Sequence, residues 1–366
     1  IELVGIDQIE FVRGPQSALF GRNTLGGLIN ITSTRPSLKT WSGNLVGPFG
    51  NFSARDLRGT ASGPLVIDKL ALSVGVGYTA RDGYTINDLT AHDLDRRSAT
   101  FGKLQLLWTP ASNWVVRGLV SGERARDGDY ALNDLAALRA NPRHAKRDVE
   151  GFTDRDLVAP TLFVSRTGKQ VDFSSITGFV WWNTRDLTDL DYTPASLITR
   201  DNHEKDHQFT QELRVASARN TALLASKGVT LKWQAGASVF TQNYTQDAVN
   251  SFSPGLLYQP GSFGGGFPPG FSPANAQHSP QSSLDDAGVG VYGQGTLTFK
   301  QALDVMIGVR SDYEHKKATL KTFFDIPDPF LGPAATLTPD NTFTDVSPQF
   351  TVAYRLGAGR MVYGSA

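Results

Sequence analysis

The 366-residue chain contains no cysteine and no excess of either charge. Without cysteine it cannot form disulfide bonds or thiolate metal sites. Lys plus Arg and Asp plus Glu both number 35, so the formal net charge is zero. Because no overall positive charge draws the chain to nucleic acid, we set aside nucleic-acid binding as a main function.

Long apolar runs are also missing, since no stretch approaches the roughly 18 apolar residues of a transmembrane helix. The lack of long apolar runs does not exclude a membrane β-barrel, because the strands of such barrels show only a weak alternation over about ten residues. The mean hydropathy of −0.24 suits such a barrel and also a soluble β protein. The sequence begins at Ile1 with no initiator methionine or signal peptide, so we expect a mature or truncated piece.

From about Trp41 onward, apolar and polar side chains alternate as they do in β-strands with one apolar face. The pattern recurs at 70–80, 229–239 and 346–356. In its clearest stretch, one set of residues alternates with a second: Leu303, Val305, Ile307 and Val309 with Asp304, Met306, Gly308, Arg310 and Asp312. We expect the first set to face away from the barrel interior, and we count about thirteen strands in all.

The connections between these strands alternate in length. Short turns are expected at 64–69, 110–113, 168–170, 300–302 and 357–359, and long polar segments at 83–97, 128–160, 184–206, 242–285 and 316–345. This rhythm is typical of a transmembrane antiparallel barrel with tight periplasmic turns and long extracellular loops. A soluble β adhesin would not need long loops at one end only.

Aromatic residues gather near the expected strand ends: Trp108, Trp114, Trp181, Trp182 and Tyr192. Such positions are typical of the aromatic girdles at a membrane interface, although ordinary sheet aromatics are the alternative. An open half-barrel of thirteen strands would expose two edges and a wide apolar face. We therefore expect an internal fragment that lacks strands at its C-terminal end.

The stretch 6–36 has a different sequence pattern, with a short β run, a Gly-Pro break, a small-residue segment and a second β run. Gly14-Pro15 ends the first run and turns the chain, and Gly26-Gly27 lets the backbone bend before the second. The stretch has few large apolar side chains, so polar contacts would hold it. We expect it to fill the interior of the barrel.

IEFVRGPQSALFGRNTLGGLINITST resembles the late plug-domain signature of TonB-dependent outer-membrane receptors. The matching residues are Ile9, Glu10, Val12, Arg13, Gly14, Pro15, Ser17, Phe20, Gly21, Gly26, Gly27, Ile29, Asn30 and Ile31. Segments 209–217 and 346–356 also resemble the barrel of that family. The resemblance implies an all-β fold in which 1–36 is the C-terminal part of an α+β plug and 37–366 the N-terminal part of a 22-stranded barrel.

The resemblance also implies a function, namely active import of a scarce, bulky nutrient across the outer membrane of a Gram-negative bacterium. A ferric siderophore is the commonest ligand of that family, and cobalamin, saccharides and other metal chelates are the alternative ligand classes. The implied partners are the TonB complex of the inner membrane, outer-membrane lipid and the ligand; no cofactor and no enzymatic activity are expected. The TonB box is absent from these residues. A passive porin or a β-barrel enzyme is the alternative, but a porin needs no plug and no catalytic set is recognisable.

Within the implied site, an ion pair is expected between plug and barrel wall. Phe209, Leu213 and Val215 share one face of a strand, so Glu212 and Arg214 face the interior. We expect Glu212 to pair with Arg13, with Glu10 in the same charged group; the alternative is that Glu212 pairs only along the wall. The expected plug turns use Gly14, Pro15, Gly21, Gly26 and Gly27.

Ligand contact is expected from the plug apex and one outer loop. On the plug these residues are Phe20, where relatives often carry tyrosine, and Arg22. The segment 251–283 is rich in Gly, Pro, Ser and Phe. It is either a plain flexible loop or a lid whose Phe263, Phe267 and Phe271 contact the ligand.

Two motifs are set aside. His203-Glu204-Lys205-Asp206-His207 matches the zinc-protease pattern, which requires a helix. A strand follows it, and on a strand the two histidines would lie roughly 13 Å apart. The run 21–27 lacks the Lys-Ser/Thr end of a phosphate loop. We therefore expect no catalytic residue and no metal site.

Overall fold

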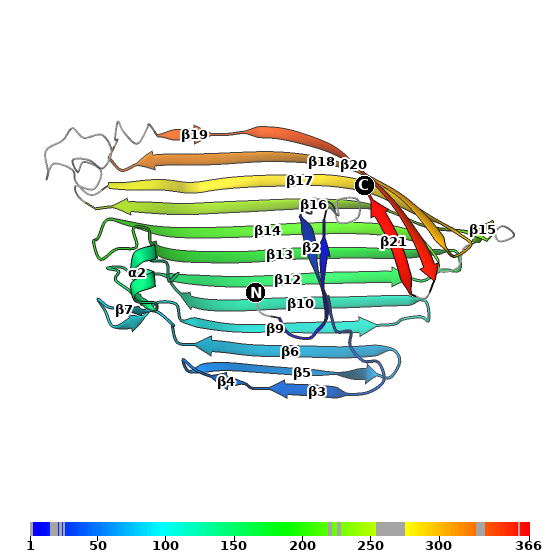
Figure 1. Ribbon diagram of the computed structural model, residues 1–366, viewed down its shortest axis with the longest axis horizontal. Helices are drawn as coiled ribbons and strands as arrows, with labels where there is room; N and C mark the ends of the chain where they lie inside the picture. Colours follow the sequence, from blue (N-terminus) through cyan, green and yellow to red (C-terminus); the bar gives the residue numbers. More distant parts are fainter. Residues whose placement is uncertain are drawn as a thin grey trace.

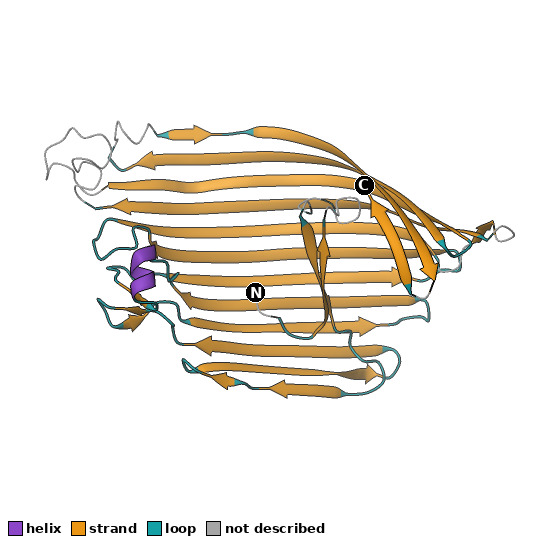
Figure 2. Ribbon diagram, in the orientation of Figure 1, coloured by secondary structure: helices purple, strands orange, loops and turns teal. Residues whose placement is uncertain are grey.

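The computed structural model describes residues 3–14, 21, 24, 26–218, 222–224, 228–253, 275–326, 334–357 and 359–366. Among these residues, no helix is long and apolar enough to cross a membrane. The described chain is built almost entirely of β-strands, with the short helix α2 (Leu135–Ala140) among the long loops (Figure 2).

One large antiparallel sheet contains thirteen successive strands, as predicted. In spatial order they are β3 (Ser42–Val46), β5 (Ala54–Val66), β6 (Leu70–Arg81), β9 (Arg97–Trp108), β10 (Trp114–Gly128), β12 (Phe152–Arg166), β13 (Val171–Asp189), β14 (Ile198–Ser217), β16 (Val229–Phe252), β17 (Asn275–Phe299), β18 (Leu303–Phe324), β20 (Asp340–Gly357) and β21 (Arg360–Ser365). Each strand pairs with its neighbours in this order, which is the up-and-down topology of a barrel wall.

Short strands extend this wall and its loops. β4 (Phe49–Gly50), β15 (Ala222–Leu224) and β19 (Ala335–Leu337) pair with strands of the wall, while β7 (Ile86–Asn87), β8 (His92–Asp93) and β11 (His144–Ala145) form a small sheet in the loops. The short turns after β5, β9 and β12 lie at one end of the wall, and β7 and α2 lie at the other (Figure 1). The predicted alternation of short and long connections is therefore confirmed.

The predicted faces are also confirmed. Ile307 and Val309 are 62% and 50% exposed, whereas Gly308 and Arg310 between and beside them are buried. On β6, Val76 is exposed and Ala71 is fully buried. Because apolar side chains cover the exposed face, the wall presents an apolar outer surface suited to lipid.

The strands are longer than the alternation predicted. The segment 184–206, expected as a loop, is strand except for 190–197. Beyond the membrane a strand has no apolar face to maintain, so its sequence is polar on both sides and resembles a loop. The prediction of long loops was too generous for this reason.

The predicted girdle holds only in part. Trp108 and Trp114 flank the turn between β9 and β10, and Trp108 is half exposed. Trp182 instead points inward, because its Nε1 donates to Asp206, which is 3% exposed. A partly buried indole usually finds a hydrogen-bond acceptor, and the carboxylate of Asp206 supplies one.

The hairpin of β1 (Ile6–Arg13) and β2 (Gly27–Ser33) crosses one face of the wall, which we call the inner face (Figure 1). Arg58 of β5 donates to the carbonyl of Leu3 at 2.7 Å, and Lys103 of β9 donates to Ser33 at 2.9 Å. Gln105 donates to the carbonyl of Thr34 at 2.9 Å. These contacts are polar, as predicted for the opening stretch; the division into two domains at residue 36 stays a prediction.

Candidate functional site

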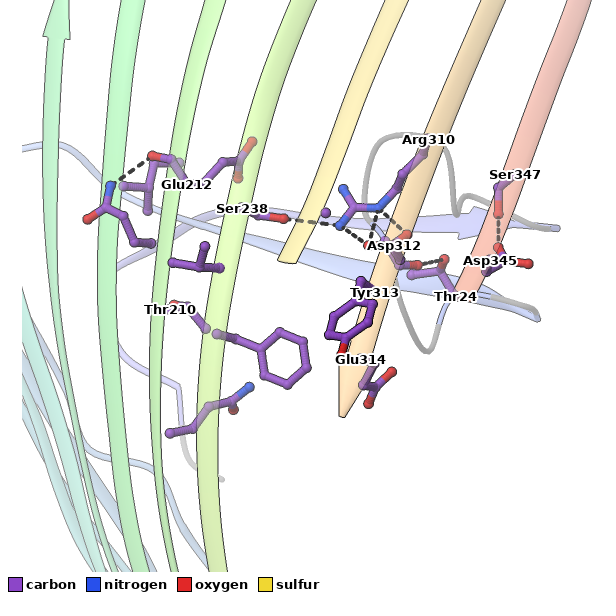
Figure 3. Close-up of a pocket in the computed structure, with 17 residues that line it drawn as sticks. Thr24, Thr210, Glu212, Ser238, Arg310, Asp312, Tyr313, Glu314, Asp345 and Ser347 are labelled. Atoms are coloured by element: carbon purple, nitrogen blue, oxygen red, sulfur yellow. Dashed lines mark hydrogen bonds and ion pairs between the residues drawn. The ribbon is translucent and has the colours of Figure 1, made fainter. Parts of the chain in front are cut away.

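The loop between β1 and β2 meets the inner face in a cavity of about 560 Å³ (Figure 3). Gly21 and Thr24 of the hairpin lie on one side of it. The wall side comes from β13, β14, β16, β17, β18 and β20, and includes Glu212, Ser238, Phe240, Arg310, Asp312 and Asp345. The cavity therefore lies on the boundary between the hairpin and the wall, and most of the residues that line it are polar or charged.

A local turn fixes the hairpin side of this boundary. Thr24 Oγ1 donates to the carbonyl of Gly21 at 2.7 Å, and both residues are buried. Gly21 has a φ of +73°, in the left-handed region that glycine adopts without strain. The turn thus presents the backbone of residue 21 to the wall.

Arg310 supplies the wall side of the contact and is only 7% exposed. Its Nε donates to Asp312 at 2.7 Å, and its Nη2 donates to Ser238 of β16 at 3.1 Å (Figure 3). A Cβ at Gly290 would lie 2.2 Å from Arg310 Nη2, so only glycine leaves room for this side chain across β17. Arg310 is therefore neutralised and positioned by the wall.

Tyr292 of β17 extends this network. Its hydroxyl donates to Glu212 of β14 at 2.5 Å, and the Arg310 guanidinium lies 5.6 Å from its ring centre. A Cβ at Gly236, on the strand between them, would clash with the Tyr292 ring at 2.5 Å. The small residue on β16 lets Tyr292 reach Glu212 across the intervening strand.

The predicted ion pair between Arg13 and Glu212 is not formed in this structure. Within the described part of the chain, Arg13 makes no ion pair and no side-chain hydrogen bond, and Glu212 is bound by Tyr292. Arg214 donates to Ser174 at 3.3 Å. Glu10 accepts hydrogen bonds from Gln8 and Asn30 within the hairpin. Glu212 is therefore bound along the wall, through the hydroxyl of Tyr292.

The plug turns stay a prediction, and the structure describes Gly14, Gly21, Gly26 and Gly27 of them. Gly14 and Gly27 have φ of +82° and +133°, and a Cβ at Gly27 would lie 2.3 Å from the carbonyl oxygen of Val12. Gly26 has no neighbour that would exclude a side chain. The remaining predicted site residues fall outside the described residues: Pro15, Phe20, Arg22, Phe263, Phe267 and Phe271.

A second buried arginine, which the sequence did not indicate, joins the long loops. Arg147 is fully buried and donates to Asp129 at 3.1 Å and to the carbonyl of Leu132. Its backbone exchanges hydrogen bonds with the side chain of Asn87, and its guanidinium lies 4.9 Å from the ring centre of Tyr192. Burial raises the pKa of the Asp129 carboxyl, while Arg147 and the Tyr130 amide oppose that rise. Arg147 thus ties three loops together.

Glu150 forms a neighbouring loop cluster. It accepts hydrogen bonds from Thr90, from Asn87 at 3.2 Å and from His92 at 3.1 Å. Burial alone would raise the pKa of Glu150, but these hydrogen bonds outweigh it and hold the pKa below its usual value.

The zinc-protease pattern at 203–207 lies on the strand β14, where His203 Nε2 is 2.6 Å from Asn183 Oδ1. In the described ranges, no three His, Asp or Glu side chains gather as metal ligands. The strand geometry agrees with setting this motif aside.

Comparison with known proteins identifies the architecture, although no family model matches the chain. The ferric yersiniabactin uptake receptor FyuA from Yersinia pestis superposes with a TM-score of 0.78 at 20% identity, over 99% of this chain and 52% of that one. The chain has the fold of a TonB-dependent outer-membrane receptor. It spans about half the length of that solved receptor, and an outer-membrane location follows from the fold.

Curated relatives agree over shorter segments. The pesticin receptor of Yersinia pestis is 31% identical over 138 residues, which cover 36% of this chain and 20% of the relative. The vitamin B12 transporter BtuB of Vibrio cholerae is 26% identical over 159 residues, covering 42% of this chain and 24% of the relative. These relatives are receptors and transporters rather than enzymes, as predicted.

Proposed function

We propose that the protein imports a ferric siderophore across the outer membrane in a TonB-dependent manner. The observation that carries this proposal is the hairpin on the inner face, held to the wall by polar contacts such as Lys103 to Ser33. A passive porin would need an unobstructed lumen. The likeness to FyuA, a ferric yersiniabactin uptake receptor, supports the siderophore class.

In the proposed cycle the ligand binds between the long loops and the tip of the hairpin. The TonB complex of the inner membrane then pulls on the plug, and the hairpin leaves the wall. Polar contacts such as Arg58 to the Leu3 carbonyl are readily exchanged for water. Displacement would therefore expose little apolar surface, and no covalent chemistry is required of these residues.

Cobalamin is the second candidate ligand, because one relative is the vitamin B12 transporter BtuB. That sequence match covers 42% of this chain at 26% identity. Several solved structures of the same fold are receptors for ferric siderophores or siderophores, including FyuA and PiuA, and this supports the siderophore class.

The test is uptake by the full-length protein in a strain that otherwise lacks it. We expect radiolabelled iron to enter from defined ferric siderophores, and uptake to cease when the inner membrane is de-energised. Empty-vector cells give the background. Uptake that persists unchanged without energy would overturn active import in favour of a passive pore, and uptake of labelled cobalamin alone would replace the siderophore.

A further inference from the structure

Gly21 of the hairpin lies beside Arg310 of the wall. A Cβ built on Gly21 would lie 3.0 Å from Arg310 Nη2 and 3.1 Å from its Cζ, which is tighter than an ordinary contact. Residue 21 therefore lies close against the guanidinium. Both residues are buried, so water does not separate them.

The wall satisfies Arg310 without help from the hairpin. Asp312, on the same strand, accepts from Nε at 2.7 Å and from Nη2 at 2.7 Å, and Ser238 accepts from Nη2 at 3.1 Å. These hydrogen bonds all stay within β16 and β18. The positive charge would thus keep its partners if the loop moved away.

This arrangement differs from an ion pair that spans the boundary. Separating a buried pair leaves a desolvated charge on each side, which is strongly unfavourable. Between Gly21 and Arg310, only packing against an already neutral group is lost. The contact can hold the loop in register and still open without exposing an unpaired charge.

We propose that the hairpin docks on Arg310 at Gly21, and we call Arg310 the seat. Because Arg310 is paired within the wall, the hairpin can dock and leave repeatedly. The inference rests on the proposed function in treating the hairpin as a movable plug. It assigns to Arg310 a positioning role in keeping the resting channel closed. Gly21 is the matching residue on the plug, because a Cβ there would press on the Arg310 guanidinium and a φ of +73° disfavours a side chain.

The experiment measures passive leak rather than transport. The full-length protein is placed in planar bilayers for conductance, and cells are tested for exclusion of a large hydrophilic antibiotic. Arg310→Ala removes the seat from the wall side, and Gly21→Val displaces the loop from the plug side. We expect each variant to raise conductance and antibiotic sensitivity several-fold. The double variant should leak no more than the leakier single one, since both changes remove one contact.

Arg355→Ala is the matched control. Arg355 of β20 pairs with Asp304 of β18 at 2.5 Å, so its loss removes another arginine–aspartate pair of the wall. We expect the control to stay as tight as the unmodified protein. Equal leak from Arg355→Ala would overturn the proposal, because it would report general weakening of the wall.

Wild-type conductance of both Arg310→Ala and Gly21→Val, at normal amounts in the outer membrane, would also overturn the seat. Gly21→Val leaves the wall unchanged, so it tests the proposal even if Arg310→Ala fails to fold. The two proposals fail separately: leaky variants without energised uptake in the parent would keep the seat and remove the transport function. Energy-dependent uptake by the parent, together with variants that do not leak, would keep the transport function and remove the role of Arg310.

Discussion

Among the residues that the structure describes, two arginines are buried, Arg147 in the long loops and Arg310 beneath the hairpin, and they differ in what their contacts hold together. Arg147 pairs with Asp129 and the Leu132 carbonyl inside its own loop, and contacts two other loops through Asn87 and the Tyr192 ring. Arg310 directs its hydrogen bonds to the wall and packs against the hairpin. Opening the loop 129–151 would separate a buried ion pair, whereas moving the hairpin away from Arg310 would not. The loop around Arg147 is therefore built to stay folded, and the hairpin boundary is built to part.

The largest effect is expected from a substitution of Arg147. Arg147→Met would leave the carboxylate of Asp129 buried and unpaired, since both side chains are at most 1% exposed. Removing one partner of a buried pair typically costs about 3–5 kcal/mol. We expect a loss of that order in the free energy of local opening, measured as faster hydrogen exchange of amides in 129–151.

Arg185→Met is the control for this change. Its pair with Asp201 is 56% and 43% exposed, and exposed pairs contribute about 0–1 kcal/mol. If the amides of 129–151 exchange hydrogen at the same rate in both variants, Arg147 does not hold this loop folded, and it does not differ from Arg310 in what its contacts hold together.

A smaller effect is expected at Tyr292. Tyr292→Phe removes the hydroxyl that donates to Glu212 but keeps the ring beside Arg310. Leaving a part-buried acceptor unpaired costs about 1–3 kcal/mol, so we expect a lower urea midpoint for the folded wall. Conductance should stay unchanged, because the seat is retained.

Tyr354→Phe, at a half-exposed tyrosine of β20, controls for hydroxyl loss. A leak from Tyr292→Phe as large as that from Arg310→Ala would show that Tyr292 also holds the hairpin, rather than only stabilising the wall.

The smallest effect concerns pH. Hydrogen bonds hold the pKa of Glu150 below its usual value of about 4.3. A lowered pKa contributes stability that is present above the unfolded value and is lost as the pH falls through the folded value. The loops 82–96 and 129–151 should therefore loosen only in strong acid. Burial shifts the pKa of Asp129 in the opposite direction, so its contribution falls as the pH rises and partly offsets this trend.

Because the chain has no cysteine, a spin label on Ala91→Cys reports loop mobility from a unique site. Its mobility should increase as the pH falls below about 4. Glu150→Gln should remove the pH dependence, and its persistence in that variant would assign the titration to another group.

Local pattern predicted the wall well, because the side of a strand on which Ile307 or Arg310 lies depends only on alternation. Partners could not be predicted in the same way. Tyr292 and Glu212 are 80 residues apart and meet across an intervening strand, so their pairing depends on strand order and on the space left at Gly236. The expected Arg13–Glu212 pair failed for this reason. Arg147 carried no signal, since a lone arginine in a polar loop resembles a solvated one.

The hairpin also has a mechanical direction. Its rungs run from Ile6 opposite Ser33 to Arg13 opposite Gly27, so its two free ends lie side by side. Shortly after Ser33, the amide of Ser37 is tied to Ser62 of the wall. A tug ahead of Ile6 would load a single rung at a time and peel the ladder open, whereas a force along the strands would load every rung together. Ahead of Ile6 the chain is held to the wall through the Leu3 carbonyl and Arg58, and from the end of β2 onward it is held through Ser33, Thr34 and Ser37. The hairpin therefore resists a shearing force more strongly than a pull on the chain ahead of Ile6.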